Sequence, residues 1–248
     1  MKGKITIDIP DYLTIGQHQT ITQVKNGTKL ERLVSIVEAL SDYKREEIEK
    51  WPISTLSQIG NDLLQVADAK GEFHTLIEFK GQLYGYAHMN NATLGEYIDL
   101  ENLCKDFQGN LHKVAAILYR PVKKHKFDNI LYNIKQGIRT VKNGVEDVFG
   151  WYEVEVYDNE KAKERHEIMK DFPVHIIMGA ISFFLSTADL YLTDTLYSQG
   201  KITKEEQMEM ERRTMDLLLQ SIGAGSVLYT RYRNPKSSRL LDIPLSLN

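Results

Sequence analysis

The stretch NATLGEYIDLENLCKDFQGNLHKVAAILYRPV, residues 91–122, decides how the rest of the chain is expected to pack. Its pattern predicts two helices separated by a short polar break. The first begins at a capping box, in which the Thr93 hydroxyl accepts from the Glu96 N–H and the Glu96 carboxylate accepts from the Thr93 N–H. The face expected to be buried consists of apolar residues at helical spacing, namely Leu94, Tyr97, Ile98 and Leu103.

The second helix follows a polar break at residues 106–110. Its predicted core face also recurs every three or four positions, at Leu111, Val114, Ala115, Leu118 and Tyr119. Pro121 is expected to end this helix, because proline has no N–H donor and disfavours helical geometry in the residue before it. We therefore expect residues 91–122 to be a central packing unit between an N-terminal helical block and a C-terminal helical hairpin.

The composition is typical of a globular protein. With 248 residues, the chain is long enough for one large domain or two small ones. Its hydrophobic content of 42% is enough to form a core. The formal net charge of −3 gives no whole-chain argument for nucleic acid or an anionic membrane as partner. Cys104 is the only cysteine, so an intrachain disulfide is excluded, and a small residue packed on a helix is its favoured interpretation.

The N-terminal third predicts one strand, short helices and a hairpin. Residues 4–9 alternate as a strand does, and Pro10 ends that strand. A second capping box, Thr14-Ile-Gly-Gln17, begins a short helix. Three further helices are expected within residues 28–69, the last capped by Ser54 or Thr55. Two strand-like runs around Lys80-Gly81 predict a β-hairpin.

The C-terminal half predicts a helix over about 128–142, a strand at 151–157 and then three helices. The first of these begins at Asp158 or Asn159. Residues 172–192 approach the length of a membrane span, but they contain His175 and Asp189, so we interpret them as a buried helix. Gly200 ends that helix, and Thr203-Lys-Glu-Glu206 or its neighbours cap the last one, which gives a long helical hairpin.

Together these patterns predict a mainly α fold with small β elements: a helical bundle with a β-hairpin, a short N-terminal strand and an extended C-terminal tail. Residues 1–225 are expected to form a single mainly helical domain, with sub-blocks 1–70 and 90–225 around a hairpin at 72–89. Residues 226–248 form a basic tail with too little apolar content to fold by itself.

Two alternatives stay open for this tail: it is disordered, or it is ordered only against a neighbouring subunit, as an added strand or in a groove. Pro244 would confine such a strand to a sheet edge. The candidate contact residues are its cations and apolar side chains: Arg231, Arg233, Lys236, Arg239, Leu240, Leu241, Ile243, Leu245 and Leu247.

No catalytic motif is recognisable in the sequence. Phosphate-binding glycine loops, nucleophile elbows and zinc-ligand spacings are missing, so we expect a protein that is not an enzyme and has no cofactor or metal. Asp189 stands alone in an apolar run, and a paired structural acid is its favoured interpretation. The basic residues 122–126 are interpreted as a solvated turn, and DNA contact through them and the tail arginines is kept as a weaker alternative.

Several short strings resemble a group of tailed-bacteriophage proteins from the structural and assembly gene block of Bacteroidetes phages, crAss-like phages included. The strings span residues 4–196: LTIGQ at 13–17, WPISTL at 51–56, TLGEYIDLE at 93–101, NLHKVAAILYRP at 110–121 and MGAISFF at 178–184.

This resemblance implies a virion component such as a connector or tail-ring subunit, or else a tail assembly chaperone that is absent from the mature particle. The partners it implies are further copies of this chain and other phage structural proteins, with no membrane. The implied location is the virion, or the host cytoplasm during assembly. It brings no catalytic residues. We expect deletion of residues 226–248 to weaken assembly and leave the fold intact.

Overall fold

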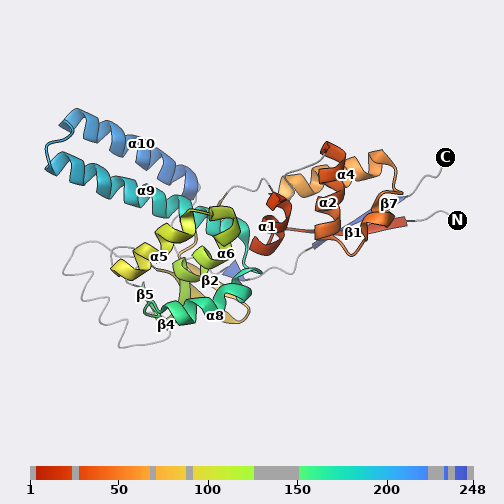
Figure 1. Cartoon of the computed structure of the whole chain (residues 1–248), viewed down its shortest axis with the longest axis horizontal. Helices are drawn as coiled ribbons and strands as arrows, with labels where there is room; N and C mark the ends of the chain where they lie inside the picture. The colour runs from red at the N-terminus through yellow and green to blue at the C-terminus, as the bar shows by residue number, and fades with distance from the viewer. Residues whose placement is uncertain are drawn as a thin grey trace.

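The computed structural model describes residues 4–23, 28–67, 71–87, 92–125, 151–222, 232–233 and 238–244. Helices dominate these residues and the strands form small sheets, so the predicted mainly α fold with small β elements is confirmed. Figure 1 shows an N-terminal lobe, a central body with the larger sheet, and a helical hairpin that projects from the body. The helix predicted over 128–142 lies outside the described residues, as do the side chains of Cys104 and Asp189.

The N-terminal lobe contains one strand and four helices: β1 (Lys4–Pro10), α1 (Ile15–Gln23), α2 (Lys29–Leu40), α3 (Arg45–Ile48) and α4 (Ile53–Ala67). The capping box predicted at Thr14 is present, because the Gln17 N–H donates to Thr14 Oγ1 at 3.2 Å and the Thr14 N–H donates to Gln17 Oε1 at 2.9 Å. α2 begins at a capping box that was not predicted, formed by Thr28 and Glu31.

The predicted cap of α4 is wrong. The helix begins at Ile53, ahead of both Ser54 and Thr55, and Thr55 is buried. The Leu56 N–H donates to the Pro52 carbonyl at 3.1 Å. Proline suits the start of a helix because its φ is already helical and its missing N–H would have had no partner there.

The lobe has its own hydrophobic core. β1 contributes Ile7 and Ile9, and the helices contribute the other buried residues: Leu33, Val34, Ile36, Val37, Ile48, Leu56, Ile59 and Leu63. Ile21, Leu40 and Val66 pack against this core and also against the core of the central body. The two cores therefore adjoin.

The central body contains a five-stranded sheet of order β5-β4-β3-β2-β6. Its strands are β2 (Leu76–Phe79), β3 (Gln82–Tyr86), β4 (Tyr119–His125), β5 (Tyr152–Val154) and β6 (Tyr232–Arg233). β6 pairs parallel to β2, and the other neighbours are antiparallel. β2 and β3 form the predicted hairpin, in which Lys80 and Gly81 have φ of 49° and 78°. A type I′ turn requires positive φ at both positions.

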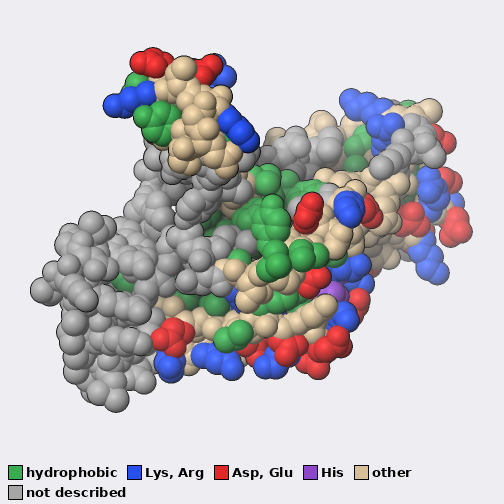
Figure 2. All heavy atoms as spheres, turned by 60° about the vertical axis from the view of Figure 1, so that its left-hand side comes forward, with side chains coloured by type: hydrophobic (Ala, Val, Ile, Leu, Met, Phe, Trp, Pro, Cys, Tyr) green, Lys and Arg blue, Asp and Glu red, His purple; other side chains and the backbone are tan. Residues whose placement is uncertain are grey.

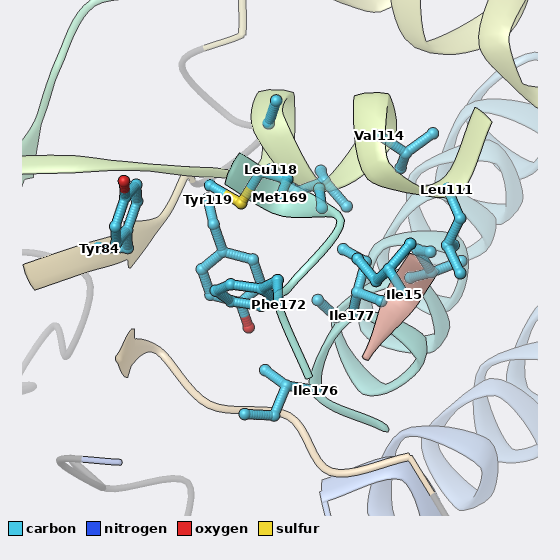
Figure 3. Close-up of a cluster of buried hydrophobic side chains, with 14 of the residues drawn as sticks. Ile15, Tyr84, Leu111, Val114, Leu118, Tyr119, Met169, Phe172, Ile176 and Ile177 are labelled. Atoms are coloured by element: carbon cyan, nitrogen blue, oxygen red, sulfur yellow. The ribbon is translucent and has the colours of Figure 1, made fainter. Parts of the chain in front are cut away.

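Helix α6 (Phe107–Leu118) is the centre of the main core. Its side chains are buried on nearly every side: Leu111, His112, Val114, Ala115, Ala116, Ile117 and Leu118. Figure 3 shows Leu111, Val114 and Leu118 among side chains from α1, α9 and the segment after α8. α5 (Leu94–Cys104) and α8 (Asn159–Met169) pack against α6. The prediction that residues 91–122 contain a buried packing unit is therefore right for α6.

The boundaries within this stretch differ from the prediction. Asp106 is the N-cap of α6, since the Gly109 N–H donates to its Oδ1 at 3.3 Å, so the polar break is shorter than residues 106–110. The helix ends at Leu118, and Tyr119 is the first residue of β4. Pro121 lies within that strand, where its carbonyl accepts from the Glu155 N–H at 2.9 Å.

The basic residues 122–125 continue β4, so the solvated turn predicted for 122–126 is wrong over this range, and Lys126 lies outside the described residues. His125 is buried, while Lys123 and Lys124 are both exposed. The regular alternation of a strand is interrupted at this point, because the register with β5 shifts between Val122 and Lys124.

α9 (Val174–Ser198) and α10 (Lys204–Ile222) form the predicted hairpin, with Gly200 at φ 67° between them. The start of α9 lies in the main core and crosses the chain at Glu72, where a methyl group on Gly179 would come within 2.3 Å of the Glu72 backbone. Over the described residues, no helix combines the length and hydrophobicity needed to span a bilayer.

The C-terminal residues return to the N-terminal lobe. β7 (Ser238–Pro244) pairs antiparallel with β1 over its whole length, from Lys4↔Pro244 to Pro10↔Ser238, and the two strands form a separate two-stranded sheet. An added strand was one of the two forms expected for the tail. Its partner in the structure is the same chain, whereas a neighbouring subunit was expected.

Candidate interaction surface

Helix α5 lies in the opposite orientation to the one predicted from its apolar residues. Leu94, Tyr97 and Ile98 are exposed, and Leu94 is 75% accessible. Glu96 and Leu100 are buried instead. The helix therefore places Glu96 and Leu100 against the core and Leu94, Tyr97 and Ile98 toward solvent. Of the predicted buried face, Leu103 packs against the core as expected.

An ion pair explains this orientation. The Glu96 side chain is 2% exposed, the Arg120 side chain is 8% exposed, and Arg120 Nη2 lies 3.3 Å from Glu96 Oε1. Only half of the capping box predicted at Thr93 is seen, because the Glu96 N–H donates to Thr93 Oγ1 at 3.2 Å while the carboxylate is directed to Arg120. Arg120 belongs to β4, so the pair fastens α5 to the sheet.

A second contact from α5 supports the same orientation of the helix. The Tyr157 hydroxyl donates to Asp99 Oδ2, and Asp99 lies one turn after Glu96. Burial, followed by this bond to Asp99, raises the pKa of Tyr157 above its ordinary value, so the hydroxyl stays protonated as the donor. Two acids of α5 are thus held by two different segments of the central body.

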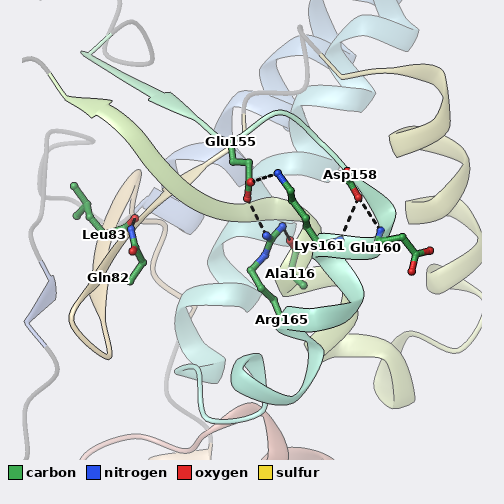
Figure 4. A network of polar contacts seen from close by, with 8 residues as sticks. All are labelled: Gln82, Leu83, Ala116, Glu155, Asp158, Glu160, Lys161 and Arg165. Atoms are coloured by element: carbon green, nitrogen blue, oxygen red, sulfur yellow. Dashed lines mark hydrogen bonds and ion pairs between the residues drawn. The ribbon is translucent and has the colours of Figure 1, made fainter.

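Further ionic contacts hold α8 to the chain that follows β5. Arg165 Nη1 lies 3.0 Å from Glu155 Oε2, and Lys161 Nζ lies 2.7 Å from Glu155 Oε1. Figure 4 shows both contacts converging on Glu155, with Arg165 also directed to the Ala116 carbonyl of α6 at 3.5 Å. The bond from Lys161 is the main cause that lowers the pKa of Glu155, so this carboxylate is ionised at neutral pH.

Glu96 has a different environment. Burial raises the pKa of its carboxyl group, and the nearby charge of Arg120 opposes that rise. Arg120 is buried as well, and burial lowers the pKa of its guanidinium group. A buried pair of this kind is costly to break, because removing one partner leaves the other charge without compensation. We interpret the cluster as a fastening for α5 rather than as a reactive centre.

The consequence is an apolar surface on the outside of the body, which we call the α5 face: Leu94, Tyr97 and Ile98. These three residues lie at helical spacing on one side of α5. Figure 2 shows hydrophobic side chains at the surface in the middle of the molecule, below the projecting hairpin. Adjacent exposed apolar residues of this kind mark contact sites more often than single ones do.

Exposed apolar residues also lie at separate points along the projecting helices, and we call this set the hairpin face: Leu185 and Tyr197 of α9 and Met208 of α10. α10 has its main contact with α9, whose first turns lie in the main core. Figure 1 shows the hairpin extending away from α5 and α6. The chain thus carries two unlike apolar surfaces.

The structure places part of the predicted contact tail. Four of its residues lie in β7: Arg239, Leu240, Leu241 and Ile243. Arg233 lies in β6, opposite Glu78 of β2. The remaining four lie outside the described residues: Arg231, Lys236, Leu245 and Leu247. The structure therefore places the described tail residues in two separate sheets.

The described geometry adds little support for the other candidate sites, the basic residues of β4 and a metal site. Lys124 pairs with Glu153 at 2.9 Å, which leaves Lys123 as the other exposed cation of β4. Within the described part of the chain, no three His, Cys, Asp or Glu side chains gather in a group able to hold a metal ion. The sequence analysis assigned Glu96 to a capping box and missed its pairing with Arg120, as well as the bond from Tyr157 to Asp99. No local pattern signals these contacts, because the partners come from other elements.

Comparison of the chain with known protein families, with curated proteins and with solved structures found no match.

Proposed function

We propose that this protein is a non-enzymatic structural protein of a tailed-phage particle, which forms a ring-like oligomer in the head–tail connector or the tail. The observation that carries the proposal is the α5 face. Helix α5 directs Glu96 to a buried ion pair and exposes a leucine, a tyrosine and an isoleucine on one side, and such an apolar side suits contact with another protein.

The second surface supports assembly from copies of one chain. Contacts between two unlike patches are heterologous, and heterologous contacts generate closed rings or open filaments. The α5 face and the hairpin face are such a pair, placed on a rigid body and on a projecting element. The phage part of the proposal is supported by the sequence resemblance alone.

The contact surface is tested by removing apolar side chains that are already exposed. We expect the purified chain to form an oligomer, measured by light scattering after size-exclusion chromatography. Leu94→Ser combined with Ile98→Ser should shift the population to monomers without lowering the unfolding temperature. Ile53→Ser is the matched control, because Ile53 is also an exposed apolar residue but belongs to α4 and to neither face.

A purified chain that stays monomeric at high concentration would count against self-assembly. Equal oligomer populations for the double variant and the Ile53→Ser control would remove the α5 face from the proposal.

The role in the particle is tested separately, by mass spectrometry of purified virions. A stoichiometric amount of the protein supports a virion component. Its absence from mature particles, together with its presence in infected cells, would replace the structural role with that of a cytoplasmic tail assembly chaperone.

A further inference from the structure

Two histidines meet where helices α6 and α8 pack together. The rings of His112 and His166 lie perpendicular to each other, with their centroids 6.0 Å apart. His112 is 9% exposed, and its Nδ1 has no hydrogen-bond partner within the described residues. Figure 1 shows α8 along the lower side of the central body, below α6. The contact therefore joins a buried imidazole with unused hydrogen-bonding capacity to a second imidazole that is partly exposed.

Two lysines lie beside this pair of rings. Lys113 follows His112 on α6. On α8, Lys170 comes four positions after His166, so the two are neighbours on one side of the helix. Lys170 pairs with Glu167 at 2.8 Å, whereas in the described part of the chain Lys113 has neither an ion pair nor a side-chain hydrogen bond. The end of a helix favours cations, which accounts for Lys170, but Lys113 lies in the middle of α6.

The surroundings of both imidazoles keep them neutral. Burial, followed by the neighbouring cations, lowers the pKa of His112 to about 4, and the pKa of His166 is lowered in the same way. The charged groups that act on the two rings come from α6 and α8: Lys113, Lys163, Arg165, Lys170 and, in the opposite direction, Glu167. A bound anion would offset the cations, so its binding would favour protonation of the rings and become tighter as the pH falls.

We propose a binding site for a small oxyanion, of the size of sulfate or phosphate, at this cluster: His112, Lys113, His166 and Lys170. Lys113 supplies the uncompensated positive charge, and the imidazole N–H groups donate hydrogen bonds to the oxygens of the ligand. The proposal does not depend on the oligomer proposed above, because the four side chains come from two helices of one chain.

The acidic side chains of α8 limit the size of the ligand. Glu160, Glu164 and Glu167 are exposed along this helix. Figure 2 shows acidic side chains among the basic ones along the lower edge of the body. A nucleic-acid backbone that followed this surface would meet these carboxylates and be repelled, whereas a compact anion can stay beside Lys113. The charges therefore favour a free oxyanion over nucleic acid.

Isothermal titration of the full chain with sodium sulfate tests the site. Sulfate keeps its double charge between about pH 5.5 and pH 8, so only the protein titrates, and chloride holds the ionic strength constant. We expect binding to be at least about fivefold tighter at the lower pH, because the rings take up protons with the anion. Sodium phosphate should bind to the same site and compete with sulfate.

Lys113→Gln is the test variant, since it removes a charge that makes no described contact. It should weaken sulfate binding at least about tenfold, which is the usual effect of losing one charged contact. Lys50→Gln is the matched control, because Lys50 is an exposed lysine in the N-terminal lobe and its replacement changes the net charge equally. The control should keep the wild-type affinity.

A second measurement follows the histidines directly. In NMR titrations, saturating sulfate should raise the pKa of His166 by at least about 0.5 in the wild-type protein and by less in Lys113→Gln. Equal sulfate affinity in Lys113→Gln and Lys50→Gln, or histidine pKa values that sulfate leaves unchanged, would overturn the site. A short DNA duplex that binds more tightly than sulfate and depends on Lys113 would also overturn it, in favour of nucleic acid.

Discussion

Glu96 and Arg120 are the residues on which the position of α5 depends. Arg120→Met would leave the Glu96 carboxylate buried without its cation, and we expect it to lower the free energy of unfolding by about 3–5 kcal/mol. Glu96→Leu combined with Arg120→Met should cost less than Arg120→Met alone, because no uncompensated charge remains. Urea unfolding of the two single variants and the double variant measures the coupling. A double variant with the summed cost of both single changes would show that the pair does not act as a unit.

His112 links stability to pH. Burial, followed by the charges of Lys170, His166 and Lys113, lowers the pKa of His112 to about 4. In the unfolded chain the imidazole has its ordinary pKa of about 6.5. The unfolded state therefore binds the proton first as the pH falls, and the stability that neutral His112 provides above pH 6.5 is lost between pH 6.5 and 4.

We expect the wild-type protein to lose about 1–3 kcal/mol more than a His112→Gln variant between pH 7 and pH 4. Chemical denaturation at several pH values measures both slopes. His18, His166 and His175 also have lowered pKa values through burial, so the variant keeps part of the dependence. Parallel curves for the two proteins would assign the acid sensitivity to other groups.

Substitution of two leucines from the same stretch compares a buried position of α6 with an exposed position of α5. Leu118 is fully buried, and Leu118→Ala should cost about 2–5 kcal/mol through lost burial and the cavity left behind. Leu94→Ala removes the same atoms from an exposed position and should stay within about 0.5 kcal/mol of wild type. Thermal and urea unfolding compare the two, and similar costs would mean that α5 faces the other way in solution.

Substitution of two glycines by alanine compares a position in close contact with another backbone segment and a position open to solvent. Gly179→Ala places a methyl group on the Glu72 backbone, where α9 crosses the chain before β2, and should cost at least about 1–3 kcal/mol. Gly95→Ala adds a methyl group to an exposed helical position of α5 and should stabilise by about 0.5–1 kcal/mol. Calorimetry of both variants gives the signs, and a stable Gly179→Ala protein would contradict the close crossing.

At the scale of the whole molecule, the tail has a structural role that changes the expected effect of its deletion. A chain that ends at residue 225 lacks β7, so β1 loses its ladder partner. Hydrogen exchange should become faster over Lys4–Pro10 and change little in α6, whose contacts come from other elements. Unchanged protection of β1 in the truncated chain would contradict the pairing.

Local sequence rules predicted much of this fold. The capping boxes at Thr14 and Thr203 and the Lys80-Gly81 hairpin depend on residues within a few positions of each other, and all are present. The orientation of α5 could not be predicted from its own residues, since the apolar ones are spread around the helix and none of them dominates. The partner that decides it, Arg120, lies 24 positions after Glu96 in the sequence (120 − 96).

Pro121 is a second residue whose local pattern gives a wrong prediction. The sequence predicts a helix that ends at Pro121, but the helix ends at Leu118, and the Pro121 carbonyl accepts a hydrogen bond from Glu155 beside the sheet. The contact of β1 with β7 spans nearly the whole chain, and its register depends on three-dimensional closure rather than on any local pattern. The sequence therefore predicts the elements better than it predicts the faces by which they meet.

The pairing of the first strand with the last also sets an order in time. During translation residue 244 follows residue 4 by 240 positions, an interval of about 12–48 s at ordinary elongation rates of roughly 5–20 residues per second. The helices of the N-terminal lobe have ample time to fold in that interval, before β7 is made. The strand that completes the sheet of the lobe is therefore among the last described parts of the chain to leave the ribosome.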